Sequence, residues 1–193
     1  MPWISNTKLL EMSLVQNKKV LASILVSITL FAVSTPARAA TSGAVIISVN
    51  QDFTSPIGTA VVTGAIGDYG TIQGADANGK VSKLAATPNA LIKLKKGTLL
   101  IDATSMNKAT SSAPLIQNTT CSFSLTATTV PWPIIKGTGA YKSVKGTLSV
   151  TLQLGGITPL YSAGPNKGKC DFSNKFPPVA SYFNVLATGT ITY

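Results

Sequence analysis

Residues 137–150 constrain the fold of this chain more than any other segment. They combine a tight glycine-rich bend with a strand in which apolar and polar side chains alternate. Gly137 and Gly139 allow backbone conformations that cost other residues energy. Tyr141 and Val144 are three positions apart, so one helical turn between them would point both side chains inward. A bend and strand of this kind are typical of the start of a hairpin strand in a small antiparallel β-barrel.

The alternation that begins at Gly146 is representative of residues 40–193 as a whole. Leu148, Val150 and Leu152 are predicted to point inward, with hydroxyl-bearing residues between them pointing outward. Apolar residues recur with a period of two, and the helical period of 3.6 is almost absent. Residues 40–193 contain no Glu and no Arg, while Thr, Val, Ile and Gly are abundant. This composition predicts one all-β domain, either a sandwich or a barrel.

The clearest alternating runs predict the positions of the strands. Strands are expected at residues 44–50, 59–66, 90–103, 122–128 and 183–193, and residues 69–73 could continue the second of them after a bend. Within the third run, residues 95–97 mark a bulge or a hairpin tip, and residues 76–79 have the composition of a turn. Two segments lack alternation and are predicted to be loops: residues 106–118, which are polar, and residues 155–178, which are rich in Gly, Pro, Asn and Lys.

The N-terminal segment has the pattern of a secretory signal peptide. Two lysines precede an apolar run at residues 20–33, and Ala37–Ala39 form a small-x-small cleavage site. The apolar run is shorter than the roughly 20 residues that span a bilayer as a helix, so an uncleaved membrane anchor is the less favoured alternative. Translation could also start at Met12. We predict a signal peptide at residues 1–39 and a secreted or envelope domain at residues 40–193, with no integral membrane segment after cleavage.

Two cysteines, Cys121 and Cys170, fall in the predicted domain. An even number of cysteines in an exported protein favours a disulfide, because the compartment is oxidising. Two free thiols are the alternative. Zinc binding is disfavoured because the chain has no His and no Cys-x-x-Cys pattern, and no cofactor is predicted.

The motif Gly-Thr-Gly-Ala-Tyr-Lys-Ser-Val-Lys-Gly-Thr at residues 137–147 resembles the signature of the allene oxide cyclase and dirigent-like barrels. Many exported bacterial proteins are similar, with one cysteine before and one after this segment. The strand spacing from Ala90 to Tyr193 is loosely similar as well. The resemblance implies a single eight-stranded antiparallel barrel, in which closure of the sheet removes its exposed edges.

The resemblance does not bring catalytic residues with it. The plant cyclases use a buried Glu, and dirigent proteins rely on Asp and Arg in the barrel lumen, whereas residues 40–193 lack both Glu and Arg. The absence of His also disfavours nucleophilic triads and imidazole acid–base catalysis. Among the acids, Asp68, Asp76 and Asp171 are interpreted as solvated turn residues. Asp102, at the end of an apolar strand, is the acid most expected to face a lumen, although an exposed strand end is the favoured interpretation.

The remaining signal is charge. Residues 40–193 carry twelve Lys against five Asp, a net charge of about +7. Such a basic exported domain could bind an anionic envelope polymer, with Lys93, Lys95 and Lys96 as the closest cluster, or the lysines could serve solubility alone. Nucleic acid is not predicted as a partner, because there is no Arg for bidentate contacts and no aromatic platform among the lysines.

Three classes of function therefore stay open. The first is binding of a small apolar molecule in the lumen or mouth of the barrel. The second is a non-catalytic interaction or structural role in the envelope, and the third, disfavoured, is an isomerase or cyclase. Trp132, between two prolines, and Asp102 are the candidate ligand contacts. Trp132 would gate a ligand if it stood at the rim, or close the core if it did not.

Overall fold

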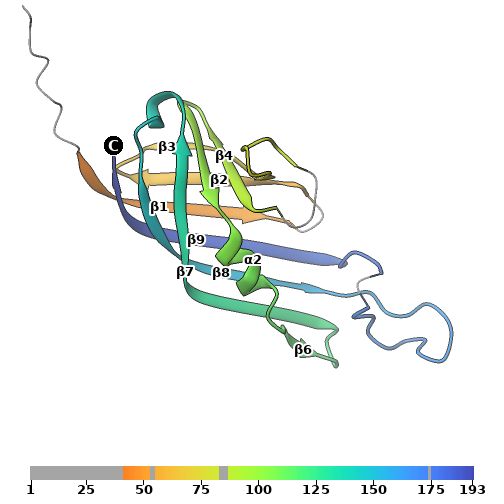
Figure 1. The fold of residues 1–193 in the computed structure, drawn as a ribbon. Coiled ribbons are helices and arrows are strands. Elements are labelled where there is room, and N and C mark those ends of the chain that lie inside the picture. The colour runs from red at the N-terminus through yellow and green to blue at the C-terminus, as the bar shows by residue number, and fades with distance from the viewer. Residues whose placement is uncertain (1–40, 53–54, 83–86, 174) are drawn as a thin grey trace, which may run out of the picture. The chain divides into compact units, whose positions relative to one another are not determined.

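Eight antiparallel strands close into a β-barrel. Figure 1 shows how the strands are arranged. The computed structural model describes residues 41–52, 55–82, 87–173 and 175–193, so the predicted signal peptide lies outside the described residues. The barrel strands are β1 (Ser42–Gln51), β2 (Ile57–Gly64), β3 (Asp68–Ala75), β4 (Asn89–Leu94), β5 (Gly97–Asp102), β7 (Ser122–Gly137), β8 (Gly146–Ile157) and β9 (Ala180–Thr192).

The sheet runs in the order β5-β4-β3-β2-β1-β9-β8-β7, and pairing between β5 and β7 closes it. A short ninth strand, β6 (Leu115–Gln117), pairs with the first residues of β7 outside this ring. The predicted all-β class and eight-stranded antiparallel barrel are therefore confirmed. The structure adds a helix, α2 (Thr104–Thr110), and a 3-10 turn, η1 (Gly139–Tyr141).

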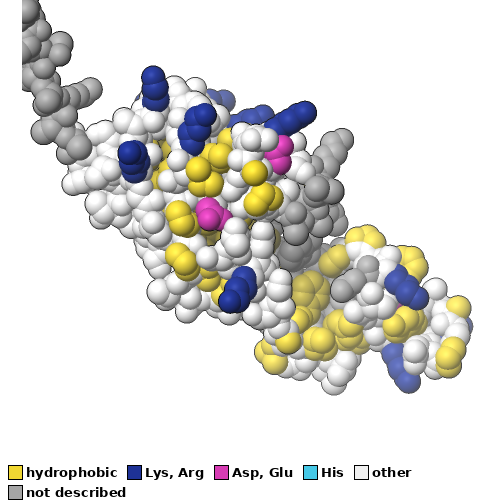
Figure 2. All heavy atoms as spheres, viewed as in Figure 1, with side chains coloured by type: hydrophobic (Ala, Val, Ile, Leu, Met, Phe, Trp, Pro, Cys, Tyr) yellow, Lys and Arg dark blue, Asp and Glu magenta, His cyan; other side chains and the backbone are white. Residues whose placement is uncertain are grey.

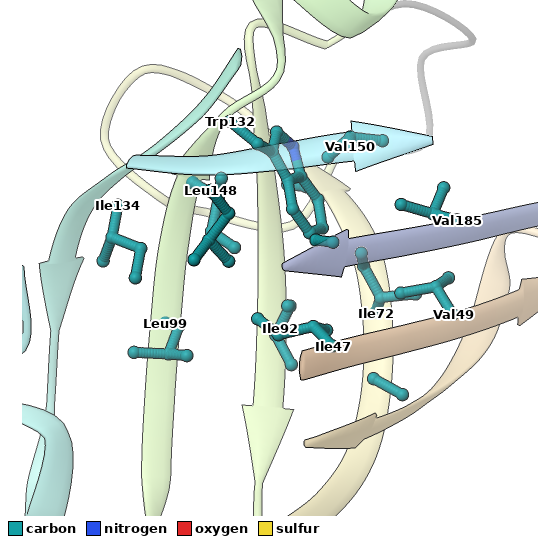
Figure 3. Packing of buried hydrophobic residues seen from close by; sticks show 14 of the residues in the cluster. Ile47, Val49, Ile72, Ile92, Leu99, Trp132, Ile134, Leu148, Val150 and Val185 are labelled. Atoms are coloured by element: carbon teal, nitrogen blue, oxygen red, sulfur yellow. The ribbon is translucent and has the colours of Figure 1, made fainter. Parts of the chain in front are cut away.

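The lumen is filled by the inward side chains of the alternating strands. Val45, Ile47 and Val49 of β1 are buried, and their neighbours in the strand are exposed. Leu148 and Val150 of β8 follow the same rule and face the same core. Figure 3 shows side chains from opposite walls of the barrel meeting in its interior. The barrel interior is thus a packed apolar core rather than an open channel.

The longest strand, β7, contains the Pro-Trp-Pro segment for which no strand is predicted. Its register with β8 shifts between Ala127 and Val130, where Thr129 takes a positive φ of 59°, which is the geometry of a bulge. Pro131 and Pro133 lie where β7 pairs only with β8, because pairing with β5 begins at Ile134. A proline without an N–H is tolerated at such an unpaired side of a strand.

Two predictions about connections need correction. Residues 69–73 do not continue the preceding strand: the chain reverses after Gly64, and β3 pairs with β2 as a hairpin. Residues 106–118 are not simply a loop, because they contain most of α2 and all of β6. Met106 of α2 is buried in the barrel core, so tertiary packing stabilises a Ser/Thr-rich helix that its own sequence would not favour. The predicted tip at residues 95–97 is the turn of the β4–β5 hairpin.

The barrel has two ends of different construction. The basic end comprises the β4–β5 turn, η1 and the connection from η1 to β8 at residues 142–145. The cavity end comprises β6, the start of β7 and the loop at residues 158–179 between β8 and β9. The two are opposite, because β7 runs from the cavity end to the basic end and β8 returns from it (Figure 1).

Candidate functional site

At the basic end, the glycine-rich bend is tied to a carboxylate on a distant strand. The hydroxyl of Tyr141 donates a hydrogen bond of 2.5 Å to Oδ2 of Asp68, the first residue of β3. The same carboxylate accepts the backbone N–H groups of Tyr69, Lys95 and Lys96 at 2.8, 3.3 and 3.0 Å. One side chain therefore joins β3, the β4–β5 turn and η1.

These hydrogen bonds change the acidity of both partners. The bond from Tyr141 is the largest cause that lowers the pKa of Asp68 from 3.8 to about 2, burial opposes it, and the backbone N–H groups add to it. Burial, with the bond to Asp68 second, raises the pKa of Tyr141 above its usual value. At neutral pH the pair is a neutral phenol bonded to a carboxylate. Tyr141 and Val144 are both buried, which fits an anchoring role.

Trp132 lies in the core and not at the rim of the barrel. Its side chain is 0% exposed and packs in the lumen among Leu148, Val150 and other apolar residues, as Figure 3 shows. Its Nε1 has no hydrogen-bond partner among the described residues. Of the two roles considered for Trp132, filling the core agrees with this position and gating from the rim does not.

Asp102 lies two residues before α2 and accepts a hydrogen bond from its first residue, rather than facing the lumen. Its Oδ1 accepts the backbone N–H of Thr104 at 2.8 Å, at the first residue of α2. Hydrogen bonds from the Thr104 side chain and backbone lower the pKa of Asp102. The half-buried carboxylate thus supports the start of α2, in agreement with the interpretation as a strand end, and it is not among the residues that line the cavity described next.

A cavity of about 740 Å³ is present at the cavity end. Phe123 and Leu125 of β7 and Leu154 of β8 line it from the barrel side, and the latter two belong to the core. The other walls come from the end of α2 and the segment after it, from β6 and from the loop before β9. These remaining lining residues are Thr110, Ser112, Pro114, Ile116, Thr158, Asp171, Phe172, Phe176, Pro177 and Pro178. Figure 2 shows hydrophobic side chains gathered over this part of the molecule, at the lower right.

Gly156 on β8 makes room for the ring of Phe123, which lines this cavity. Phe123 is paired with Gly156 across the β7–β8 ladder. A Cβ atom built on Gly156 would lie 3.0 Å from two carbons of the Phe123 ring and 2.7 Å from the backbone oxygen of Ala180. The ring therefore occupies the space that a side chain at residue 156 would fill, which lets it line the cavity.

A disulfide joins the two walls of the cavity end. Cys121, directly before β7, is bonded to Cys170 in the loop at residues 158–179, and their Cα atoms are 5.1 Å apart. The next two residues of the loop, Asp171 and Phe172, line the cavity. The bridge thus holds the loop against the start of β7. The predicted pairing of the two cysteines is the one present in the structure.

Asp171 is the acid that lines the cavity, and it is 5% exposed. Its Oδ1 accepts the backbone N–H of Ser173 at 2.9 Å. Hydrogen bonds from the side chain and backbone of Ser173 are the main causes that lower its pKa, with smaller contributions from Tyr161 and Lys175 and an opposing effect of burial. Its interpretation as a solvated turn residue is therefore wrong in part: it stays ionised in a turn, but its own side chain is buried.

Within the described ranges, no group of three or more His, Cys, Asp or Glu side chains is placed to hold a metal ion. None of the helices in the described part of the chain is both long and apolar enough to cross a membrane. Comparison of the chain with protein-family models, with curated protein sequences and with solved structures yields no significant match.

Proposed function

We propose that this protein is an exported barrel that binds a small apolar molecule in the cavity at the cavity end. The observation that carries the proposal is the cavity itself. Its volume of about 740 Å³ falls within the range of roughly 300–1,000 Å³ found for ligand sites, and its lining is mostly aromatic, aliphatic and proline side chains. The few polar groups, Thr110, Ser112, Thr158 and Asp171, could orient a ligand.

The ligand belongs at the mouth of the barrel rather than in its lumen. Ile47, Leu148, Leu152 and Trp132 are fully buried against one another and fill the interior. Displacing side chains of this size would cost several kcal/mol of packing, on the order of 2–5 kcal/mol for each. The cavity at the mouth already has the volume of a small-molecule site, so no side chain need be displaced.

We further propose that the chain is an allene oxide cyclase-like or dirigent-like barrel and that residues 1–39 direct its export. The eight-stranded antiparallel closure is the architecture that the motif at residues 137–147 implies. The disulfide supports export, because such bonds persist in oxidising compartments. Intact-mass measurement of the exported protein tests this part: a mass that starts at Ala40 is expected, and a mass that retains residues 20–33 would refute it.

Ligand binding can be tested with a neutral dye, N-phenyl-1-naphthylamine, whose emission rises in apolar surroundings. Ile116 of β6 lines the cavity and is 44% exposed, and Ile46 of β1 is 45% exposed on the outer wall of the barrel. The variants Ile116→Arg and Ile46→Arg therefore place the same charge at equally exposed strand positions, inside and outside the cavity.

We expect the wild-type protein to bind one dye per chain. Ile116→Arg should weaken binding by at least about tenfold, since a charge must then be desolvated by an apolar ligand. Ile46→Arg should bind as the wild type does, and thermal unfolding should show both variants folded. Equal binding by both variants, or no saturable binding by the wild type, would refute the proposal.

A further inference from the structure

Half of the lysines of the domain form a group at one end of the barrel. Six of the twelve at residues 40–193 lie at or within a few residues of the basic end, although they come from three separate segments of the chain. All six are exposed: Lys93, Lys95, Lys96, Lys136, Lys142 and Lys145. Figure 2 shows several Lys side chains projecting from the upper part of the molecule, and others at the lower right.

Backbone pairing makes these three segments one surface. The N–H of Ala140 in η1 donates to the carbonyl oxygen of Lys96 at 2.9 Å. Lys136 of β7 pairs with Leu100 of β5, and Lys145 exchanges backbone hydrogen bonds of 2.9 Å with Thr192 at the end of β9. Lysines that are up to about fifty positions apart in sequence are therefore neighbours in space.

Only one of the five acidic residues at residues 40–193 lies at the basic end. Asp68 is the acid of the basic end, and its carboxylate is bonded to Tyr141 and to backbone N–H groups. The other four acids of the domain lie away from the basic end: Asp52 follows β1, Asp76 follows β3, Asp102 is the last residue of β5, and Asp171 is in the loop at residues 158–179. The basic end thus carries six Lys against one Asp, whereas the rest of residues 40–193 carries six Lys against four Asp, so the net positive charge is larger at the basic end.

The spacing of these charges lets them act together. Lys93 pairs with Thr98 of β5, and β5 pairs in turn with the strand that carries Lys136. Two strand spacings separate the two lysines laterally by about 10 Å, which is close to the Debye length of about 8 Å at physiological ionic strength. The hydrogen bonds of Asp68 hold the underlying turns, so the charges are presented on an ordered framework.

We infer that the basic end binds a linear polyanion, a polymer with closely spaced phosphate, sulfate or carboxylate groups. Lysine without arginine favours recognition of charge density over recognition of a planar bidentate group. The lysines stand both on turns (Lys95, Lys96, Lys142) and on the sides of strands (Lys93, Lys136). A flexible chain can follow such a surface around the end of the barrel, whereas a flat bilayer would meet mainly the turns. The inference is independent of the cavity at the other end.

Two triple variants with the same change of net charge test it. Lys96→Gln/Lys136→Gln/Lys142→Gln removes three exposed charges from the basic end. Lys80→Gln/Lys108→Gln/Lys167→Gln removes three exposed charges from the rest of the domain. The probe is heparin, a linear sulfated polysaccharide, titrated at several salt concentrations, with vesicles of phosphatidylglycerol and phosphatidylcholine as the competing surface.

For the wild type, we expect affinity for heparin that falls linearly with salt on logarithmic axes. The basic-end triple variant should lower the slope by about one for each lysine lost and weaken binding by at least tenfold, while the control triple should bind within about twofold of the wild type. Melting temperatures show whether both variants are folded. Equal losses in both variants would mean that net charge alone attracts the polymer and would overturn the inference. Tighter binding to the vesicles than to heparin would overturn it in favour of a membrane surface.

Discussion

The two ends of this barrel are closed by different physical means. At the basic end, short turns are held by one carboxylate that accepts hydrogen bonds from a buried phenol and three backbone groups. At the cavity end, a loop of more than twenty residues is held by a disulfide in addition to backbone hydrogen bonds, and a cavity of about 740 Å³ remains beneath it. Tyr141 and Val144 are buried beneath the turns of the basic end, whereas the cavity end has a cavity beneath its disulfide-linked loop.

The proposed ligand site therefore lies at the opposite end of the barrel from the Tyr141–Asp68 hydrogen bond. Filling the basic end leaves its surface to charged side chains, so any partner there must be recognised from outside. The disulfide constrains the loop at the cavity end without requiring that it pack against a core, because a covalent link needs no buried apolar area. That freedom is what allows an apolar cavity to persist at one end of a domain whose lumen is full.

The sharpest test of the comparison is Tyr141→Ala at the basic end. Truncating this buried aromatic should cost about 3–5 kcal/mol of unfolding free energy and lower the stability of the whole barrel. Chemical denaturation measures the loss, and Tyr69→Ala, at a side chain 59% exposed, is the control and should change little. An unchanged melting temperature together with abolished dye binding would mean that the motif is functional rather than structural.

Loss of the disulfide should act on the other end. The double variant Cys121→Ala/Cys170→Ala should lose up to about 4 kcal/mol, the chain-entropy value for a loop closed by cysteines 49 positions apart. Hydrogen exchange should accelerate first at residues 158–173, while β4 and β5 keep their protection, and dye binding should weaken. Uniform acceleration over the barrel would show that the two ends are not independent. Alkylation of the unreduced, denatured exported protein provides a direct check, since free thiols would contradict the pairing.

Two glycines compare the ends by similar steric clashes, although Gly146 also has a φ of 154°, which a side chain disfavours. A Cβ atom on Gly146, near the basic end, would lie 2.8 Å from the backbone oxygen of Thr190, and one on Gly156 would lie 2.7 Å from that of Ala180. Valine at either position should cost about 1–3 kcal/mol through overpacking, and at Gly146 the positive φ should add to this cost. Gly156→Val should also displace the Phe123 ring and reduce dye affinity, whereas Gly146→Val should not. Gly67→Val, with no neighbouring atom within 4 Å, controls for the substitution itself.

The smallest effect is a pH dependence that belongs to the basic end. The pKa of Asp68 is lowered to about 2, so its contribution to stability is present above the unfolded value of 3.8 and is lost as the pH falls toward 2. Melting temperatures of the wild type and of Asp68→Asn should differ at neutral pH and converge in this acidic window. A constant difference down to pH 2 would show that the carboxylate charge does not stabilise the basic end.

Local features of the chain were predictable from sequence. Alternation along β1 and β8 assigns inward and outward faces without any knowledge of partners, because side chains in a strand point to opposite faces in turn. The hairpin turn after Leu94 and the bend at Gly139 follow from residue preferences that act over a few positions. The count of two cysteines left one intramolecular pairing to consider. The sequence pattern did not predict α2, because the stability of this helix comes from burial of Met106 in the barrel core.

The contacts made by closure of the barrel were decided by the tertiary structure alone. Tyr141 and Asp68 are 73 positions apart, and nothing in the local sequence of either residue indicates the other. The position of Trp132 in the core, the cavity beside Phe123 and the grouping of lysines from three segments depend likewise on strand register and on the pairing of β5 with β7. Sequence periodicity determines which face of each strand is apolar. Which faces and which ends then meet is decided by the closed sheet, since every pairing in a barrel constrains all the others.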